Sequence, residues 1–337
     1  MTFPPSTPCG NAFGCSFAWM GALPPRLAVA LSVATFALLA PAVAAASSSS
    51  GPTAVQPRVL FDDFSYAGTD PLFQLWRHGW KVRTAQGWPG AASATWSAAA
   101  ISFVRDPASR KNELLRLTSS TDGTAGGTSE AQICQARKFY EGTYATRVRF
   151  EDAPDSGADG DQLVETFYAI SPLQAPLDPS YSELDWEYLP NGGWGKSATT
   201  LWVTSWATVQ LDPWIADNTY ATATGSLDGW HTLVLQVAGR TVGYYLDGVP
   251  LASHGGSYYP DVPMSINYNL WFVDGGQLPA GAMRRYHEDV DWVYHQAGAV
   301  LSPRAVVAQV AKLRRAHLAF RDTVPAESPP LDSPCNF

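Results

Sequence analysis

The sequence predicts an all-β fold, an antiparallel sandwich or barrel, followed by one terminal helix. Between about residues 58 and 297 the chain consists of short runs in which apolar and polar residues alternate. Gly, Asp, Pro and Asn separate these runs, as they do where antiparallel strands are joined by turns. No stretch of helical periodicity interrupts the runs until residues 301–320, where the pattern changes.

The amino-terminal segment has the composition of a secretory signal. Residues 27–46 are mostly apolar, follow Arg26 and end in Ala-Val-Ala-Ala-Ala, as a signal with its cleavage site does. We therefore expect residues 1–46 to be removed and the mature protein to be extracellular. A single membrane anchor is the alternative interpretation, which Pro41 and the alanine-rich end disfavour.

A flexible linker is expected between the signal and the main domain. Residues 47–57 have the sequence SSSSGPTAVQP, a Ser/Pro-rich composition typical of such linkers. The main domain is expected to span residues 58–297. The 25 residues before Arg26 are long for a signal, and a start at Met20 instead of Met1 gives an ordinary length.

Nine runs within the main domain show the alternation most clearly. Successive side chains of a strand point to opposite faces, so each such run can bury one face and expose the other. The nine predicted strands are residues 113–118, 142–150, 162–170, 181–188, 199–206, 230–237, 241–246, 264–272 and 290–295.

Residues 301–320 predict one amphipathic helix. Ser302 is placed to cap its start, and Pro303 occupies the first helical position. Arg314 and Arg315, together with the nearby histidine, are expected to form a solvated face near its end. The residues at helical spacing are Val306, Val310, Leu313 and His317.

The cysteines predict a staple between the main domain and the tail. Cys9 and Cys15 lie in the expected signal region, which leaves Cys134 and Cys335. In the oxidising compartment to which export leads, these two are able to form a disulfide, and their spacing matches no metal site. The last region, residues 298–337, is expected to consist of the terminal helix and a tail. Apart from the part fixed by Cys335, the tail is expected to have no regular structure.

Three carboxylates alternate with large apolar residues in residues 181–188, whose sequence is YSELDWEY. In a strand, Glu183, Asp185 and Glu187 point to the same face. Like charges this close raise at least one pKa, so one carboxylic acid stays protonated beside an ionised neighbour. The opposite face carries Leu184, Trp186 and Tyr188.

This arrangement is suited to cleavage of a glycosidic bond. The Cα atoms of Glu183 and Glu187 are expected about 13 Å apart, from roughly 3.3 Å per residue. On a concave sheet the side chains lean together to about 5–5.5 Å, the separation used by retaining glycosidases. One glutamate attacks the anomeric carbon and the other protonates the departing oxygen. Asp185 lies between them and biases which glutamate holds the proton.

The segment Glu183-Leu184-Asp185-Trp186-Glu187 resembles the Glu-x-Asp-x-Glu signature of glycoside hydrolase family 16. Flanking stretches look like the same family and follow its order, so the resemblance covers nearly all of residues 58–296. These stretches are residues 59–64, 142–150, 229–235, 244–248, 263–271 and 289–294.

The resemblance implies a concanavalin-like jelly roll of two curved antiparallel sheets, with an open cleft for a sugar chain. It implies a retaining endo-β-glycosidase with Glu183 as nucleophile, Asp185 as helper and Glu187 as acid/base. The absence of an extra residue before the last glutamate looks more like mixed-linkage glucanases and xyloglucan-active members of the family than like most β-1,3-glucanases. The expected substrate is a β-1,3/1,4-glucan or a β-1,3-glucan. Transglycosylation, a non-catalytic lectin-like domain and a divalent-cation site built from the same acids are the alternatives.

Aromatic residues are expected to hold the sugar chain. The chain has 13 tryptophans, more than a core needs, and indole rings stack on sugar faces. Tyr181 occupies a position where the family often carries a tryptophan under the sugar. Asn269 and Trp271 lie in a strand that in the family borders the catalytic strand. Trp202 and Trp206 either pave one side of the cleft or fill the core.

Two further residues match family positions. His231 recurs in the family after Gly-Trp, and is either part of the cleft or a hydrogen-bonded strand residue. Asp291 matches a position that in some members binds a structural calcium on the convex face. One acid cannot make a calcium site, and Asp62 or Asp63 would have to lie near it. No cofactor is expected to be required.

The composition limits the classes of partner. The chain has 22 Lys and Arg residues against 30 Asp and Glu residues, a formal net charge of −8. This balance argues against nucleic acid or an anionic membrane as a partner. The expected partner is a polysaccharide substrate, without stable membrane insertion, and the protein is expected to be a monomer.

Overall fold

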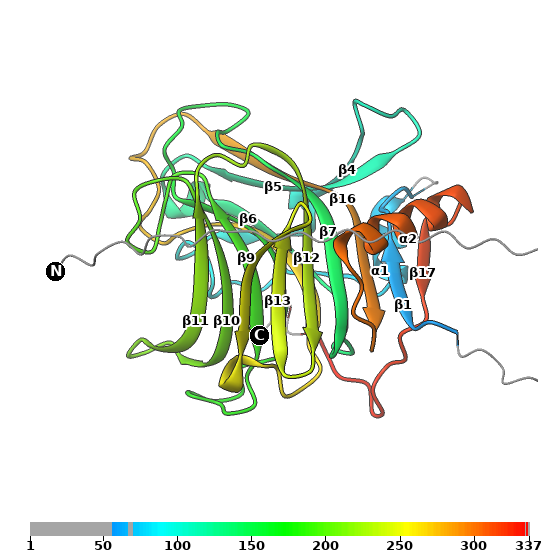
Figure 1. The fold of residues 1–337 in the computed structure, drawn as a ribbon. Helices are drawn as coiled ribbons and strands as arrows, with labels where there is room; N and C mark the ends of the chain where they lie inside the picture. Colours follow the sequence, from blue (N-terminus) through cyan, green and yellow to red (C-terminus); the bar gives the residue numbers. More distant parts are fainter. Residues whose placement is uncertain (1–55, 67–69, 334, 336–337) are drawn as a thin grey trace, which may run out of the picture. The chain divides into compact units, whose positions relative to one another are not determined.

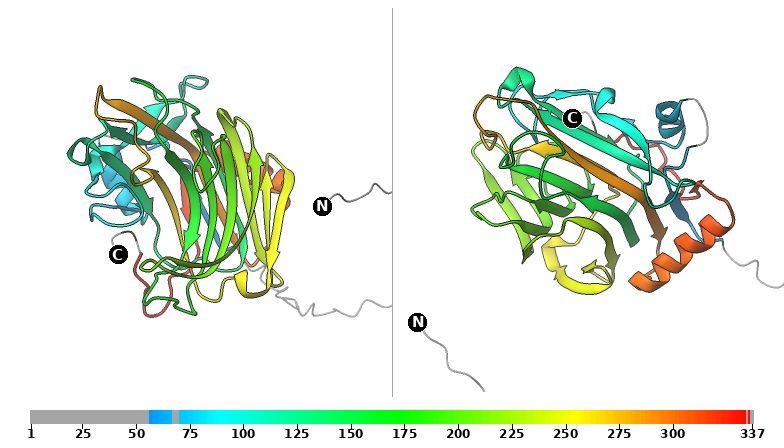
Figure 2. Two further views of the ribbon diagram at one scale, coloured as in Figure 1. Left: turned by 90° about the vertical axis from the view of Figure 1, so that its left-hand side faces the viewer. Right: turned by 90° about the horizontal axis from the view of Figure 1, so that it is seen from above.

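Seventeen β-strands form nearly all of the regular structure in the part of the chain that the computed structural model describes, residues 56–66, 70–333 and 335 (Figure 1). The predicted signal and the linker up to residue 55 lie outside the described residues. The strands form two curved sheets, which we call sheet A and sheet B, and these face each other across a common core (Figure 2). Within the described residues no helix is long and apolar enough to cross a membrane.

Sheet B contains the strand with the three acids. Its neighbours pair antiparallel throughout, so every strand except the two at the edges has a hydrogen-bonded partner on both sides. In spatial order its strands are β2 (Lys81–Val82), β6 (Ser129–Cys134), β15 (Ser265–Phe272), β8 (Leu163–Ile170), β9 (Glu183–Leu189), β10 (Thr200–Gln210) and β11 (Ile215–Thr224).

Sheet A forms the opposite layer. A short strand, β3 (Thr95–Trp96), pairs parallel to β6, and Ser120 pairs with Ser129, so the two sheets join at one corner. In spatial order sheet A contains β4 (Ile101–Arg105), β5 (Glu113–Thr121), β16 (Arg284–Ala297), β7 (Gly142–Phe150), β12 (Gly229–Ala238), β13 (Thr241–Leu246) and β14 (Val249–Gly255), with β1 (Val59–Asp62) beside β16 and β17 (Phe320–Asp322) beside β1.

The main core lies between the two sheets. Leu184 and Trp186 of β9 are fully buried there against Val148 of β7 and Leu233 and Leu235 of β12. Each sheet therefore buries one face, as the alternating sequence predicts. The fold class is confirmed: an all-β jelly-roll sandwich of two curved antiparallel sheets with a helix near the C-terminus.

The terminal helix, α2 (Pro303–Arg315), packs on the outer face of sheet A. The Ser302 side chain accepts a hydrogen bond from the Ala305 amide, as expected for a cap. The helix is shorter than predicted because the backbone turns at His317, which has a φ of 56°, and Phe320–Asp322 then forms a strand. The prediction of a helical His317 is therefore wrong.

Several elements were not predicted. A short helix, α1 (Pro71–Arg77), precedes β2, and β11 and β14 are strands whose two faces are both partly exposed, so they show no clear alternation. The predicted disulfide between Cys134 and Cys335 is present, with Cα atoms 5.6 Å apart. The tail is further tied by a bridge between Leu331 and Arg137.

Candidate active site

The three acids of β9 lie on the floor of a cleft. Because β9 pairs with β8 on one side and with β10 on the other, it is held extended over its whole length. Its apolar side chains point into the core, and Glu183, Asp185 and Glu187 point to the opposite face. There they line a cavity of about 500 Å³. The prediction that these three carboxylates share one face is confirmed.

The hydrogen bonds of the three acids are unequal. The Tyr181 hydroxyl donates to Oε2 of Glu183, and Asp185 also forms a hydrogen bond with Glu183. The indole Nε1 of Trp206 donates to Oδ2 of Asp185 at 2.7 Å. Since a hydrogen bond that stabilises the ionised form lowers a pKa, the contacts with Tyr181 and Asp185 favour ionisation of Glu183, and the Trp206 contact lowers the pKa of Asp185.

Burial raises the pKa of all three acids, but by different amounts. Burial raises the pKa of Glu183 to about 7, against the lowering effect of the Tyr181 and Asp185 hydrogen bonds. Burial and the charge of Glu183 raise the pKa of Glu187 to about 8. Burial and the charges of both glutamates raise the pKa of Asp185 well above its usual value. The hydrogen bonds of Glu183 therefore favour its ionisation, whereas burial and the charge of Glu183 oppose ionisation of Glu187.

Aromatic rings form the walls of the cleft. On β10, Trp206 pairs with Glu183 and Trp202 pairs with Glu187, so both tryptophans flank the acids. Trp194 places its ring 6.3 Å from that of Trp202 and 6.2 Å from that of Trp271. The aromatic residues that line the cavity are Trp88, Trp194, Trp202, Trp206, Trp214, Tyr220 and Trp271.

The predicted sugar-contacting residues divide into two groups. Trp202, Trp206 and Trp271 line the main cavity, and Asn269 lines a smaller one beside it. Asn269 donates from Nδ2 to the Tyr168 hydroxyl at 3.3 Å, which fixes its amide beside the acids.

Tyr181 does not line either cavity. Its side chain is buried with Tyr168, Ile170 and Val209, and its hydroxyl is used by Glu183. The expectation that Tyr181 contacts substrate is therefore corrected. A residue at the start of β9 that turns its ring into this apolar cluster can reach the carboxylate but not the open cleft.

His231 is a hydrogen-bonded strand residue of sheet A. Its Nδ1 lies 2.7 Å from Oδ2 of Asp247, and its Nε2 lies 2.9 Å from the carbonyl oxygen of Leu227. Its ring stacks on Phe150. Because β12 belongs to the sheet opposite the acids, the expected cleft role of His231 is corrected.

The surroundings of Asp291 do not fit a calcium ion. Its carboxylate accepts hydrogen bonds from Asn112 at 2.8 Å, Arg147 at 2.8 Å and Arg314 at 2.7 Å. Asp63 lies 3.8 Å from Arg314, on the same guanidinium. Two cationic side chains occupy the positions that a cation needs, and no group of three metal-ligating side chains occurs among the described residues. The calcium expectation and the expected solvation of Arg314 are both corrected.

Three cleft tryptophans were not predicted. Trp88, Trp194 and Trp214 lie between strands, each directly beside a Gly or a Pro, and each is at least 44% exposed. A loop tryptophan next to Gly or Pro has no strand alternation to place it in the core. That feature is the sequence signal that would have pointed to a binding role.

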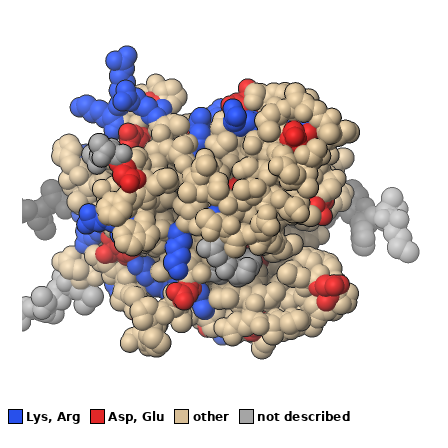
Figure 3. All heavy atoms as spheres, turned by 180° about the vertical axis from the view of Figure 1, so that it is seen from behind, with Lys and Arg blue, Asp and Glu red and all other residues tan. Residues whose placement is uncertain are grey.

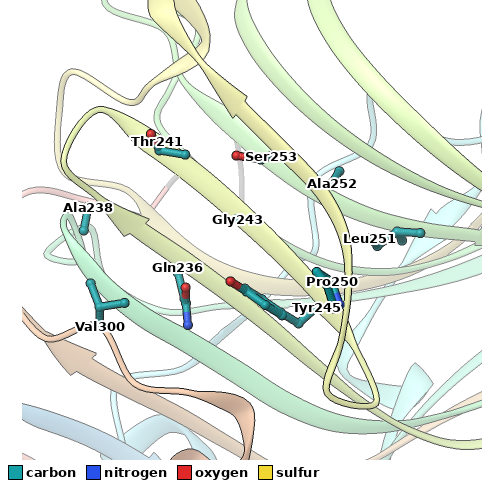
Figure 4. A pocket seen from close by; sticks show the side chains of 10 residues that line it. All are labelled: Gln236, Ala238, Thr241, Gly243, Tyr245, Pro250, Leu251, Ala252, Ser253 and Val300. Atoms are coloured by element: carbon teal, nitrogen blue, oxygen red, sulfur yellow. The ribbon is translucent and has the colours of Figure 1, made fainter. Parts of the chain in front are cut away.

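A second hollow, of about 380 Å³, lies on the outer face of sheet A between β12, β13 and β14 (Figure 4). The side chains around it include Gln236, Thr241, Tyr245 and Ser253, and Gly243 leaves the space open. It contains no carboxylate, imidazole or cationic group. The chemistry of this hollow therefore differs from that of the cleft with the three acids.

Comparison with known proteins supports the fold. No family model matches the sequence, and no curated protein is similar to it. Among solved structures, the chain is similar to a glycoside hydrolase family 16 endo-glucanase from Bacteroides ovatus, with 16% identity and a TM-score of 0.52 over 69% of this chain and 98% of that one.

Two other solved structures show the same likeness. A family 16 protein of the Bacteroides ovatus mixed-linkage glucan locus has 17% identity and a TM-score of 0.51, over 69% of this chain and 98% of that one. A structure described under endo-acting O-glycanases of human gut microbiota has 12% identity and a TM-score of 0.50, over 76% of this chain and 93% of that one. At these identities the likeness establishes the fold, which is the jelly roll found in glycoside hydrolase family 16.

Proposed function

We propose that this protein is a secreted retaining glycosidase that hydrolyses a β-linked polysaccharide by double displacement. The observation that carries the proposal is the set of three carboxyl groups on one face of β9, under an aromatic cleft and with unequal hydrogen bonding. Glu183 is the nucleophile, Glu187 the acid/base and Asp185 the helper. A lectin has no use for a pair of acids that differ in readiness to ionise, whereas double displacement requires such a pair.

The first step forms a covalent intermediate. The ionised Glu183 attacks the anomeric carbon while Glu187 gives its proton to the glycosidic oxygen, and the bond between that carbon and that oxygen breaks. Asp185 keeps its proton and its hydrogen bond to Glu183, so the nucleophile is held without a third negative charge.

The second step releases the sugar. Glu187, now ionised, takes a proton from water, and the water oxygen attacks the anomeric carbon. The bond from that carbon to Glu183 breaks, and both acids return to their starting protonation states. Two inversions at one carbon give net retention of configuration.

The cleft favours an uncharged substrate. No Lys or Arg lines the main cavity, and its walls are aromatic. On the face shown in Figure 3, basic and acidic side chains are interspersed among large uncharged areas, so that face presents no broad field of one sign. We propose a β-1,3/1,4-glucan or a β-1,3-glucan, in keeping with the mixed-linkage glucan named for the Bacteroides ovatus structure. A sulfated galactan would bring negative charge beside three acids.

Secretion and a monomeric state are part of the proposal. The disulfide between Cys134 and Cys335 is typical of proteins folded in an oxidising compartment. This supports export by the predicted signal at residues 1–46.

The nucleophile assignment is tested with Glu183→Gln. Wild-type protein is expected to release reducing sugar from barley glucan or laminarin and not from carrageenan. The variant is expected to lose this activity, and azide is expected to restore turnover of an activated aryl β-glycoside with an α-glycosyl azide as product. Glu113→Gln, outside the residues that line the cleft, is the matched control. Near-full activity of Glu183→Gln contradicts the assignment.

A further inference from the structure

A fourth carboxyl group, that of Glu130 on β6, is buried behind one wall of the cleft. Ala131 and Ile133 of the same strand point into the core, so the Glu130 side chain points to the face of sheet B that carries the acids. It is fully buried. The backbone pairing of β6 with β15 ends at Ala131 and Leu270, and beyond that point Oε1 of Glu130 accepts from the Phe272 amide at 3.0 Å. The side chain therefore takes the place of a backbone partner for β15.

The same oxygen also binds the loop between β2 and β3, residues 83–94, which we call the wall loop. Oε1 of Glu130 accepts from the Ala91 amide at 2.9 Å. Oδ1 of Asp274, two residues after β15, accepts from the Ala92 amide at 2.9 Å. Two carboxylates therefore tie the second half of the wall loop to the end of β15.

The first half of the wall loop is held by Arg83, which is buried. Its guanidinium donates to the carbonyl oxygens of Gly87 at 2.8 Å and Trp88 at 3.2 Å, and it lies 3.9 Å from the centre of the Trp96 ring. The positive charge of Arg83 also favours the ionised form of Glu130. The wall loop is thus bound by a cation in its first half and by carboxylates in its second.

A glycine gives the Glu130 carboxyl group its place. Gly90 lines the main cavity and has a φ of 124°, a conformation that favours glycine. A Cβ added there would fall 2.1 Å from Oε2 of Glu130. This oxygen has no hydrogen-bond partner among the described residues, so both hydrogen bonds of the side chain are made through Oε1.

Both backbone segments that Glu130 joins carry a cleft tryptophan. Trp271 directly precedes Phe272, and Trp88 lies three residues before Ala91; both rings line the main cavity and the smaller one. Glu130 itself lines neither cavity. We propose that Glu130 is a positioning residue that fixes Trp88 and Trp271 relative to each other, so that the cleft is preformed for a neutral glycan. This inference rests on the proposed hydrolase function and concerns substrate binding, not bond cleavage.

The test compares wild type with Glu130→Met and Glu130→Gln on soluble barley glucan, with kcat and KM determined separately. Methionine keeps a long unbranched side chain but has no oxygen for the two amides, whereas glutamine keeps one such oxygen. Glu165→Met is the matched control, because Glu165 is also fully buried and accepts from the Glu151 amide, but lines neither cavity. Thermal unfolding checks that each variant is folded.

Glu130→Met is expected to raise KM by about tenfold and to leave kcat within about twofold of wild type, because only substrate binding is weakened. The KM of Glu130→Gln and of Glu165→Met is expected to stay within about twofold of wild type. In a protein that already carries Trp88→Ala and Trp271→Ala, Glu130→Met is expected to add little to KM, since the rings through which it acts are absent.

Three results overturn the inference and leave the proposed function standing. They are a wild-type KM in Glu130→Met, a loss confined to kcat, and a further tenfold rise in KM when Glu130→Met is added to the protein without both rings. A Glu130→Met protein that does not fold assigns the residue to the fold instead of the cleft, and also overturns the inference. Absence of hydrolysis of every glycan by the folded wild type overturns the proposed function and this inference with it.

Discussion

The Tyr181 hydroxyl donates a hydrogen bond to Oε2 of Glu183, a residue only two positions further along the chain. Tyr181 lies just before β9, and its ring is buried beside Ile170 and Val209, on the face of sheet B that carries the acids. No comparable hydrogen bond lowers the pKa of Glu187, although this residue lies on the same face of the same strand. This difference supports the proposed roles of Glu183 as nucleophile and Glu187 as acid, in a site where burial raises the pKa of both.

Tyr181→Phe is expected to raise the pKa of Glu183. The hydroxyl stabilises the ionised carboxylate, so its loss requires a higher pH for ionisation, and the acid limb of kcat/KM moves upward. A shift of one pH unit corresponds to about 1.4 kcal/mol and to about tenfold lower activity on the acid side. KM is expected to change little, because Tyr181 does not line the cleft.

The matched control is Tyr294→Phe, which removes a buried hydroxyl that donates to Gln296 in sheet A. Its acid limb is expected to coincide with that of wild type. The same acid limb in wild type and Tyr181→Phe contradicts the role given to the hydroxyl.

The pH profile of the wild type is expected to be a bell. The proposed mechanism requires Glu183 ionised and Glu187 protonated, and burial raises their pKa values to about 7 and about 8. Activity is therefore expected to rise as Glu183 loses its proton and to fall as Glu187 loses its own. Because the two groups interact, the measured limbs belong to the pair.

Glu187→Gln is expected to remove the alkaline limb. With an activated aryl leaving group the first step needs no acid, so a burst of phenol is expected at both neutral and alkaline pH. Stopped-flow measurement of this burst against pH is the check. If the burst of Glu187→Gln still declines at alkaline pH, the ionisation that causes the alkaline limb belongs to another residue.

Arg314→Met is expected to destabilise the protein by about 2 kcal/mol, since it leaves the buried Asp291 with fewer partners. Burial raises the pKa of Asp291, but Arg314, Asn112 and Arg147 bring it below its usual value. A lowered pKa contributes stability that is present above the unfolded-state pKa and is lost as pH falls through the folded-state pKa. The difference between wild type and Arg314→Met in urea unfolding is therefore expected to shrink in strong acid.

The effect of calcium on the Tm is a second test of the surroundings of Asp291. The Tm of wild type is expected to be the same in calcium and in a chelator, because Arg147 and Arg314 already neutralise Asp291. A rise in Tm with calcium would contradict the account of this site.

Glu288→Gln is expected to be more stable than wild type, by a difference in unfolding free energy that increases as pH rises. Glu165 and Glu288 are both fully buried, and burial raises the pKa of each well above its usual value. A carboxyl group with a raised folded-state pKa makes the protein less stable as pH rises above the unfolded-state pKa, which is about 4.3. The gap between Glu288→Gln and wild type is expected to widen by up to about 1.4 kcal/mol per pH unit for one group. Denaturant unfolding between pH 5 and pH 8 measures this gap, and a gap independent of pH contradicts the prediction.

The positions of the three acids on the cleft floor were predictable, because the alternation of acidic and apolar residues along one strand determines them. In residues 181–188 one face is apolar and the other acidic, so only one orientation of β9 buries Leu184 and Trp186. The same rule places Trp202 and Trp206 beside the acids once β10 pairs with β9.

The walls were not predictable because they depend on contacts between distant segments. Trp88 is held by Arg83 nearby, but also by Glu130 and Asp274 through the adjacent backbone, and no local pattern links these positions. Arg314 likewise looked solvated on its helix, since the sequence does not show that α2 places it against Asp291.

The stereochemistry of the first product tests the central claim most directly. Proton NMR during hydrolysis of a soluble β-glucan distinguishes the anomer that forms first from the one that appears by mutarotation. If Glu183 forms a covalent intermediate, the β-anomer appears first and the α-anomer follows. The α-anomer as the first product would mean direct attack by water, and would contradict the role of Glu183 as nucleophile.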